Sequence, residues 1–358
     1  MGIRFHRPRV RTIVLIVLAV VLVVAGVVGF RVWSNVRAVL PGGGETAPVN
    51  GRYNVLLIGS DSADWRDGAR ADSTTVVSVD AVTGRTLMIS IPRNLVRVPF
   101  VATSPLAAKY PDGYVCPNQA TEPCMLTMAY QTGLDNADLY PGSRDPGSQA
   151  MIDAVEGITG LTMNYYAFID MDGFEQLIDA LGGIDLDIRA RVPVGALGQT
   201  AYWIEPGPHH FSGEEALWYV RTRVNTDDYA RMVRQKCVML AAVNSLDPST
   251  LATHFLSLSD AATQMARTNI PVGQVTTLTG LASKATTWTV SGLSLTPPLI
   301  DPLNPDYAQI RTLVAGSITE VEGLDQGGSG GSGTSGSGGT SGTGKGTSTS
   351  DLTTTCGL

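Results

Sequence analysis

Acidic and basic residues stand close together in the first part of the chain. Two of them are aspartates and two are arginines: Asp61, Arg70, Asp72 and Arg93. Two neighbouring carboxylates form a site for a hard cation, and Mg²⁺ with phosphate is the usual use of such a pair when arginines flank it. Solvated loop charges that make casual surface pairs are the alternative interpretation. The first interpretation makes Asp61 and Asp72 candidate metal ligands.

A second group of charges lies between residues 219 and 235, and its candidate residues are Arg221, Arg223, Asp228, Arg231 and Gln235. The planar guanidinium fork of arginine suits phosphate oxygens, often two at once, so this density of arginines indicates phosphate binding. Arg231 and Gln235 are four residues apart and share a side of an amphipathic helix predicted for 229–246. A basic helix lying on a membrane surface is the alternative. The alternation in 219–223 weakens it, because both arginines there point the same way if the segment is extended.

Three apolar stretches must position the first group of charges. They predict strands at Tyr53–Gly59, Ser73–Asp80 and Thr86–Pro92, with a hairpin turn at 81–85. In an up-down-up meander, the end of the first strand, the start of the second and the end of the third meet at one edge of the sheet. We therefore expect the two aspartates and two arginines of the first group to converge there.

Helices and strands alternate in the middle of the chain. Ser148–Gly157 and Met171–Leu181 are predicted helices, and Asn164–Asp170 and Ile184–Ile188 are predicted strands. The strand–helix–strand unit suggests parallel pairing beside the antiparallel start. The expected fold is therefore α/β, a three-layer α/β/α domain with a mixed central sheet, preceded by one transmembrane helix.

An apolar run near the N-terminus predicts an uncleaved membrane anchor. At 1.5 Å per residue it approaches the roughly 30 Å of the hydrocarbon core. Four arginines between residues 4 and 11 precede it, so the positive-inside rule leaves the N-terminus in the cytoplasm. A cleaved signal peptide is the alternative, but arginine and tryptophan follow the run where a small-residue cleavage site would stand. The expected segments are a cytoplasmic basic tail (1–11), a transmembrane helix (12–33), a linker (34–50), an extracytoplasmic catalytic domain (51–325) and a disordered Gly/Ser/Thr-rich tail (326–358).

The overall charge and the cysteines bear on three kinds of function: nucleic-acid binding, disulfide bonding and metal binding. A net charge of −7 argues against nucleic-acid binding. Cys116 and Cys124 bracket a short loop and are expected to pair in an oxidising compartment, which contributes about 2–3 kcal/mol. A metal site is the alternative, but the spacing is wider than Cys-x-x-Cys and no histidine is near. Cys237 is expected to be a buried small apolar residue, and Cys356 has no assigned role.

The charged motifs, in their order along the chain, resemble the LytR-CpsA-Psr family of membrane-anchored phosphotransferases. The matching stretches are NVLLIGSD (54–61), RADS (70–73), ISIPRN (89–94), NYYAFIDMDGFEQLIDALGGIDLDI (164–188), IEPGPHHFSGEEALWYVRTR (204–223) and DDYARMVRQK (227–236). The family transfers glycopolymers from a polyprenyl-diphosphate carrier to the cell wall, typically peptidoglycan. The resemblance therefore implies a phosphotransferase at the cell membrane that joins a glycopolymer to peptidoglycan through a phosphodiester bond.

The resemblance also implies roles for individual residues. Asp61 and Asp72 would bind Mg²⁺, or Mn²⁺ in its place, and an apolar tunnel in the core would hold the lipid tail. The residues expected around the diphosphate are Arg93, Arg221, Arg223, Arg231 and Gln235, joined by Arg70 from the first group of charges. Asp228 and Asp72 are both candidates for the general base, and the sequence does not choose between them. Phosphoryl transfer depends mainly on positioning and charge stabilisation, so little help from a base is needed.

Two positions depart from the family pattern. Asn94 stands where an aspartate commonly follows Ile-Pro-Arg, and Met125 stands where many members have a lysine. The missing lysine removes one positive charge from the expected pocket. Three alternatives to the transferase remain: a polyprenyl-diphosphate pyrophosphatase with water as acceptor, a non-catalytic lipid-diphosphate binding protein, and a structural anchor to the cell wall.

Overall fold

The computed structural model describes most of the predicted extracytoplasmic domain. The described residues are 46–61, 70–116, 124–195, 199–224, 227–244, 266–271 and 290–323, several single residues between 274 and 288, and 349–351 and 356 near the C-terminus. The predicted transmembrane helix at 12–33 lies outside these residues. Within them, no helix has the length and apolar character needed to cross a membrane.

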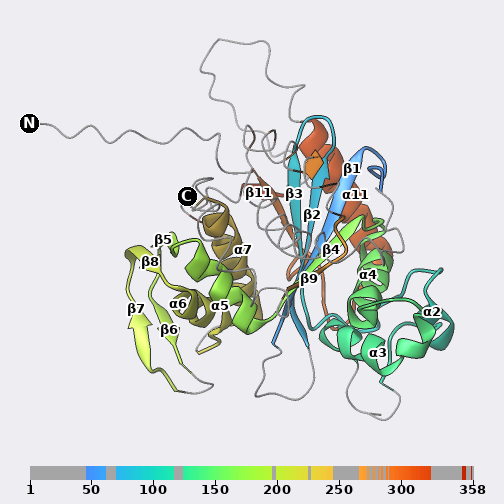
Figure 1. Ribbon diagram of the computed structural model, residues 1–358, viewed down its shortest axis with the longest axis horizontal. Helices are drawn as coiled ribbons and strands as arrows, with labels where there is room; N and C mark the ends of the chain where they lie inside the picture. The colour runs from blue at the N-terminus through green and yellow to red at the C-terminus, as the bar shows by residue number, and fades with distance from the viewer. Residues whose placement is uncertain are drawn as a thin grey trace, which may run out of the picture.

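A seven-stranded mixed sheet forms the centre of the domain (Figure 1). Its middle is an antiparallel meander of β1 (Arg52–Ser60), β2 (Ala71–Asp80) and β3 (Thr86–Ile91). Four shorter strands extend it: β4 (Tyr165–Ile169) pairs parallel to β1, β9 (Ala266–Thr268) antiparallel to β4, β10 (Ser291–Ser294) parallel to β3, and β11 (Ser350–Asp351) antiparallel to β10. The mixed sheet expected from the sequence is confirmed.

Helices cover both faces of this sheet (Figure 1). One layer contains α5 (Met171–Ala180), α6 (Gly213–Arg221) and α7 (Asp228–Asn244). The other contains α2 (Pro105–Lys109), α3 (Ala129–Asp135), α4 (Pro146–Thr159) and α11 (Tyr307–Gly323), with the short 3-10 helices η2 (Leu126–Met128) and η3 (Ala137–Leu139). Alternate residues of each strand face one layer or the other, so the sheet separates two apolar clusters.

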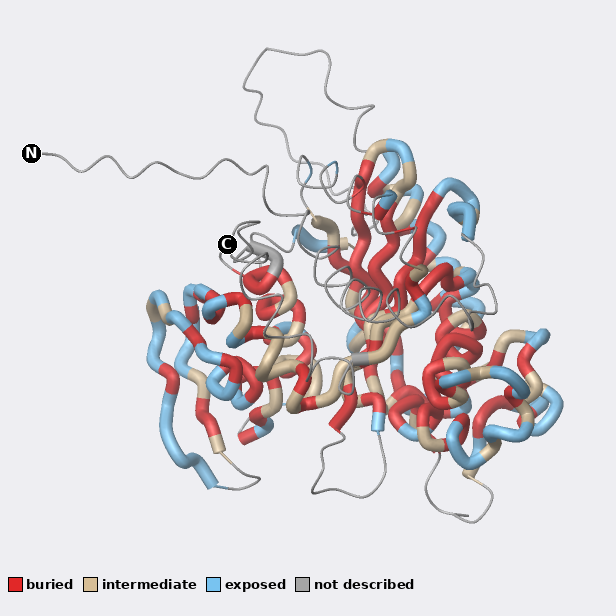
Figure 2. The backbone as a smooth tube through the Cα atoms, in the orientation of Figure 1, coloured by how far each residue is buried: buried red, intermediate tan, exposed pale blue. Residues whose placement is uncertain are grey.

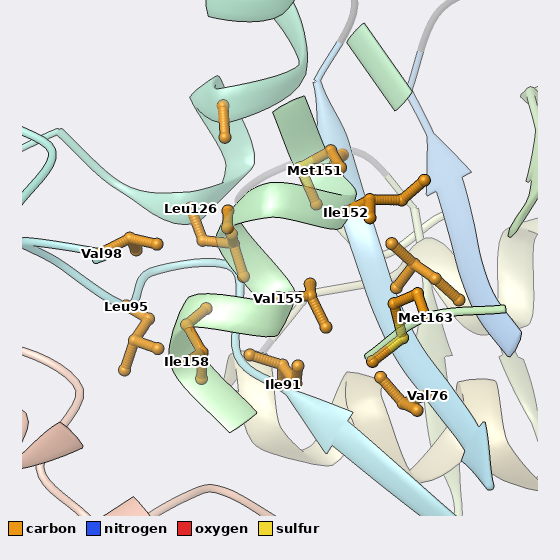
Figure 3. Packing of buried hydrophobic residues seen from close by; sticks show 14 of the residues in the cluster. Val76, Ile91, Leu95, Val98, Leu126, Met151, Ile152, Val155, Ile158 and Met163 are labelled. Atoms are coloured by element: carbon orange, nitrogen blue, oxygen red, sulfur yellow. The ribbon is translucent and has the colours of Figure 1, made fainter. Parts of the chain in front are cut away.

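The cluster on the α4 side is densely filled. Met151, Val155 and Ile158 of α4 pack against Val76 and Ile91 of the sheet (Figure 3). Figure 2 shows the strands of the meander buried along most of their length. Residues of such interiors are packed as closely as in organic crystals, so this face supplies the rigid base on which the meander rests.

The strand at Ile184–Ile188 departs from the expected parallel pairing. It forms β5, but β5 pairs antiparallel with β8 (Gly207–Phe211) in a separate two-stranded ribbon. The parallel partner of β4 is β1 instead. The reason is visible in β5 itself, whose residues alternate between buried and exposed because Asp185 and Asp187 point to solvent. A parallel strand inside a sheet is normally buried on both faces. A second ribbon, β6 (Val192–Val194) with β7 (Tyr202–Ile204), lies beside it.

Residues 349–351 and 356 near the C-terminus form contacts that the prediction of a disordered tail over 326–358 did not include, and the rest of that tail lies outside the described residues. Ser350 and Asp351 form the edge strand β11, and Cys356 is disulfide-bonded to Cys237 of α7 with Cα atoms 5.2 Å apart. Cys237 is therefore buried as half of a disulfide, and Cys356 has a structural role. A Gly/Ser/Thr-rich composition cannot bury apolar surface. The disulfide of Cys356 and the two residue pairs of β11 with β10 do not depend on buried apolar surface. The composition of the tail therefore did not predict them.

The Cys237–Cys356 disulfide should stabilise the fold. We expect the double substitution Cys237→Ser with Cys356→Ser to lower the free energy of unfolding by about 2–4 kcal/mol, because the bond closes a long loop in the unfolded chain. Urea unfolding of the oxidised full-length chain in detergent measures this difference. Equal unfolding midpoints for both proteins, or labelling of Cys237 and Cys356 by a thiol reagent in the native protein, would contradict the prediction.

Candidate active site

The first group of charges converges at one edge of the sheet, as the meander predicts. The last pair of the β1–β2 ladder is Ser60 with Ala71. Just beyond it, the backbone N–H of Asp61 donates to the carbonyl oxygen of Arg70 at 3.1 Å, and the N–H of Arg70 donates to Asp61 Oδ1 at 3.1 Å. The hairpin register therefore holds Asp61 beside the start of β2.

An ion-pair network joins this edge to the first turn of α7. Arg93 at the end of β3 lies 2.7 Å from Asp72 Oδ1 and 3.0 Å from Asp228 Oδ2. Arg231 lies 3.1 Å from Asp228 Oδ2 and 3.8 Å from Asp72 Oδ2, and it also donates to the backbone oxygen of Asp72 at 3.1 Å. Two guanidinium groups and two carboxylates thus connect three elements that are distant in sequence.

Burial and charge act against each other in this network. Burial alone would raise the pKa of Asp72, but the charges of Arg93 and Arg231 and the hydrogen bond from Arg93 outweigh it, so the pKa of Asp72 is lowered. Burial and the neighbouring Arg93 lower the pKa of Arg231 to about 10, although Asp228 and Asp72 oppose this shift. Arginine stays protonated in proteins. Burial is the main cause of the lowered pKa of Arg231, and an anion placed beside this side chain would favour its charged form.

One cavity of about 580 Å³ brings the predicted site residues together. Eight of the nine predicted metal, catalytic and substrate-binding residues line it: Asp61, Arg70, Asp72, Arg93, Arg221, Arg223, Arg231 and Gln235. Its other walls are mostly apolar, and most of them come from the sheet and from the layer of α5, α6 and α7. They include Tyr53, Val55, Leu57, Val77, Val79, Met88, Phe174, Leu177, Ile178, Leu217, Val238, Leu240, Ala242, Leu278 and Leu281. The polar residues and the apolar residues thus share a single continuous space.

Asp228 is the predicted catalytic residue that does not line this cavity. Its Oδ2 atom accepts hydrogen bonds from both Arg93 and Arg231, at 3.0 and 3.1 Å. A carboxylate held by two guanidinium groups fixes their separation and direction. The structure therefore gives Asp228 the geometry of a residue that positions arginines. Of the two carboxylates considered as a general base, Asp72 is the one that faces the cavity.

The arginines at 221 and 223 are presented by the C-terminal end of α6. The helix begins with a capping box, in which Ser212 and Glu215 satisfy each other's backbone N–H groups, and ends at Arg221. Thr222 leaves the helix with ψ of 135°, and its hydroxyl donates to the carbonyl oxygen of Pro193 at 2.6 Å. The segment is therefore a helix end rather than the extended stretch considered above, and both arginines still reach the cavity.

Arg234 of α7 holds this helix end in place. It is buried, and it donates to the carbonyl oxygens of Tyr219, at 2.9 Å, and Thr222. Those carbonyls belong to the last turn and cap of α6, where no helical N–H remains to bind them. The sequence analysis named Arg231 of the same helix as a site residue, but it gave Arg234 no role. Only the direction in which each side chain leaves α7 distinguishes a backbone clamp from a cavity residue.

Sequence analysis missed one residue next to the network. Thr127 of η2 donates from its hydroxyl to Asp72 Oδ1 at 3.3 Å, and its backbone N–H donates to the carbonyl oxygen of Arg93 at 3.0 Å. Thr127 stands two residues after Met125, a position that the family pattern places at the expected pocket, and this nearness was the one sequence signal for it. Met125 itself forms an isolated bridge with Val96, and neither Met125 nor Asn94 lines the cavity. The two residues that depart from the family pattern are thus not part of the cavity wall in this chain.

The two candidate metal ligands fit Mg²⁺ by the chemistry of their donor atoms. Asp61 and Asp72 both line the polar part of the cavity and offer hard carboxylate oxygens. Among the described residues there is no group of three or more His, Cys, Asp or Glu residues that could hold a metal ion. A site with two carboxylates suits Mg²⁺ in particular, because this ion usually keeps several waters and completes its shell with substrate phosphates.

Comparison with known proteins identifies the family. Residues 41–311 match the model of the LytR_cpsA_psr family. The chain belongs to this family. It is 28% identical over 287 residues to the cell wall biosynthesis protein LcpA of Corynebacterium glutamicum, which covers 73% of this chain and 54% of that protein. It is 26% identical to the polyisoprenyl-teichoic acid–peptidoglycan teichoic acid transferase TagU of Halalkalibacterium halodurans, with 61% of each chain covered. The match thus spans about half to three-fifths of these two relatives.

Relatives of known structure share the fold. The crystal structure of Bacillus subtilis TagV superposes with a TM-score of 0.52 at 23% identity and covers 75% of this chain and 96% of that one. The structure of TagT bound to LIIa-WTA superposes with a TM-score of 0.50 at 20% identity and covers 78% and 93%. The α/β architecture with a mixed central sheet is therefore that of the family.

The ion pairs of Asp72 should make stability depend on pH in the acidic range. The folded protein lowers the pKa of Asp72 below its unfolded value of about 3.9, so the stabilisation is fully present above about pH 4 and is lost as the pH falls through the folded pKa. We expect the difference in melting temperature between the native protein and Asp72→Asn to be constant above about pH 5 and to shrink toward pH 2. Asp187→Asn, in an exposed position of β5, is the control. A difference independent of pH would contradict the assignment.

Proposed function

We propose that this protein transfers a glycopolymer from a polyprenyl-diphosphate carrier to peptidoglycan and forms a phosphodiester bond. The observation that carries the proposal is the single cavity in which an arginine–aspartate cluster opens into apolar walls. A polyprenyl diphosphate has the same two parts, a doubly charged head and a long apolar chain. The relatives named as transferases between polyisoprenyl-linked teichoic acid and peptidoglycan support the same reaction class.

The diphosphate would lie at the polar end of the cavity. Five arginines line it there, at positions 70, 93, 221, 223 and 231, together with Gln235. Bidentate contacts from guanidinium groups fix phosphate oxygens in both position and direction. Asp72 and Asp228 hold Arg93 and Arg231 in advance, so their orientation is set before the substrate arrives. Such preorganised charges stabilise a transition state without reorganising during the reaction.

The reaction would join an acceptor hydroxyl to the phosphorus that carries the sugar. The hydroxyl oxygen forms a bond to this phosphorus, and the bond from phosphorus to the bridging oxygen breaks. Polyprenyl phosphate leaves with that electron pair, and the arginines neutralise its charge. The hydroxyl proton would pass to water, because both carboxylate oxygens of Asp72 are already paired with Arg93 and Arg231. Phosphoryl transfer relies mainly on positioning and charge stabilisation, so a weak base suffices.

Asp61 and Asp72 would hold Mg²⁺ beside the diphosphate. When bound, this ion neutralises negative charge on phosphate oxygens. The apolar segment at 12–33 would anchor the chain in the cell membrane with its N-terminus in the cytoplasm, and the catalytic domain would face the cell wall. A membrane anchor would keep the cavity within reach of carriers embedded in the same bilayer.

A turnover assay tests the proposal directly. The full-length chain in detergent, which keeps the Cys237–Cys356 disulfide, is given a polyprenyl-diphosphate glycan and peptidoglycan fragments with Mg²⁺ or with EDTA. We expect joining of glycan to peptidoglycan with Mg²⁺ only, and a loss of about 100-fold in Arg221→Ala, because one transition-state donor is removed. Arg191→Ala is the matched control, since Arg191 pairs with Glu205 and does not line the cavity.

The same assay, together with one experiment in cells, separates the alternatives. Release of glycan phosphate and polyprenyl phosphate without joining to peptidoglycan would indicate a pyrophosphatase. Tight donor binding without turnover, across several donors, would indicate a non-catalytic lipid-diphosphate binding protein. Full function in the cell after substitution of Asp61 or Asp72 would indicate a structural wall anchor. Any of these three results would contradict the transferase.

The apolar part of the cavity should determine how long a lipid chain is bound. Ala242 of α7 is buried and lines this part, so Ala242→Phe should fill space that the lipid would occupy. We expect the affinity for a long-chain polyprenyl diphosphate to fall at least about tenfold, because each methylene that stays in water costs about 0.8 kcal/mol. Affinity for a geranyl diphosphate of two isoprene units should stay unchanged. Val233→Phe, at an exposed position of the same helix, is the control. Equal losses for long and short chains would contradict the assignment.

A further inference from the structure

An exposed tryptophan stands at the cavity, next to the phosphate-binding arginines. Trp218 is 37% exposed and also lines the cavity, so its indole lies at the boundary between cavity and solvent. It precedes Arg221 by one turn on α6, and the guanidinium carbon of Arg221 lies 5.8 Å from the centroid of the indole ring. The capping box of α6 and the bond from Thr222 to Pro193 hold this helix at both ends.

The indole has an unused hydrogen-bond donor. In the part of the chain that the structure describes, no protein group accepts a hydrogen bond from Trp218 Nε1. Tryptophan combines a wide apolar face with one polar N–H at its edge. A ligand that matches this side chain has an apolar face with hydrogen-bond acceptors at its rim, and a sugar ring has both.

We propose that Trp218 stacks against the sugar ring that is attached to the diphosphate of the donor. This inference rests on the proposed function, because it places the diphosphate at Arg221. The first sugar is bonded to that diphosphate and must leave the polar end of the cavity towards solvent. A pyranose ring presents a face of C–H groups with hydroxyls around its rim. The C–H face covers the indole, and a rim oxygen accepts the bond from Nε1. Trp218 thus selects a sugar-bearing carrier over a bare one.

The other exposed aromatic residues of this region are placed differently. Trp203 of β7 is 39% exposed, but it does not line the cavity. The guanidinium carbon of Arg191 lies 4.1 Å from its ring centroid, so the protein itself covers one face of this indole. Trp203 therefore serves as a matched control with the same residue type and similar exposure.

The test compares two probes with the full-length protein in detergent. One is undecaprenyl diphosphate, and the other is undecaprenyl diphosphate carrying one N-acetylglucosamine. We expect Trp218→Ala to weaken binding of the sugar-bearing probe about tenfold and to leave binding of the bare probe unchanged. Trp218→Tyr should recover most of the loss, because tyrosine also offers an aromatic face to the sugar. Trp203→Ala should bind both probes as the native protein does.

The outcomes separate this inference from the proposed function. Unchanged binding of the sugar-bearing probe by Trp218→Ala overturns the sugar contact and leaves the transferase standing. Equal loss for both probes also overturns it, because Trp218 then acts only by supporting Arg221. A rise in KM for the peptidoglycan acceptor alone overturns it as well, because the stacked ring then belongs to the acceptor. Failure of the native protein to bind either probe overturns both proposals.

Discussion

The buried guanidinium of Arg231 is the constraint on which the rest of the site depends. Arg231 is only 3% exposed, and a buried charge is costly unless it is paired and hydrogen-bonded. Its partners come from two elements, Asp228 on its own helix and Asp72 at the start of β2, and Asp228 in turn binds Arg93 at the end of β3. The same ion pairs therefore hold α7 against the sheet and orient the two arginines. The polar end of the cavity contains more arginines than carboxylates, which leaves an excess of positive charge there.

The two faces of the sheet are packed for different purposes. On the α4 face, the apolar residues fill the space between sheet and helices, as protein interiors normally do. On the α7 face, residues of the other apolar cluster line a cavity of about 580 Å³ instead of closing it. An apolar cavity is a loss of packing that the densely packed face must offset. It is the feature that makes this face suited to an apolar ligand.

Helix α7 connects most of these features. It carries Arg231 and Gln235 toward the cavity, Arg234 toward the end of α6, and Cys237 toward the disulfide with Cys356. These side chains leave one helix in different directions, so a single rigid element coordinates the ion-pair network, the arginines of α6 and the C-terminal tail. A displacement of α7 would disturb all of them together.

The sequence by itself determined the meander, the convergence of its charges and the types of residue that gather at that edge. These features depend on local apolar patterns and on the fact that alternate strand ends share a sheet edge, so spacing along the chain was enough. Tertiary structure decided the pairing of β5 with β8, the positioning role of Asp228, the backbone contacts of Arg234 and the bond between Cys237 and Cys356. Each of these depends on which surfaces meet after the chain has folded back on itself. Residue type states what a side chain can bind, but only packing sets the direction in which it points.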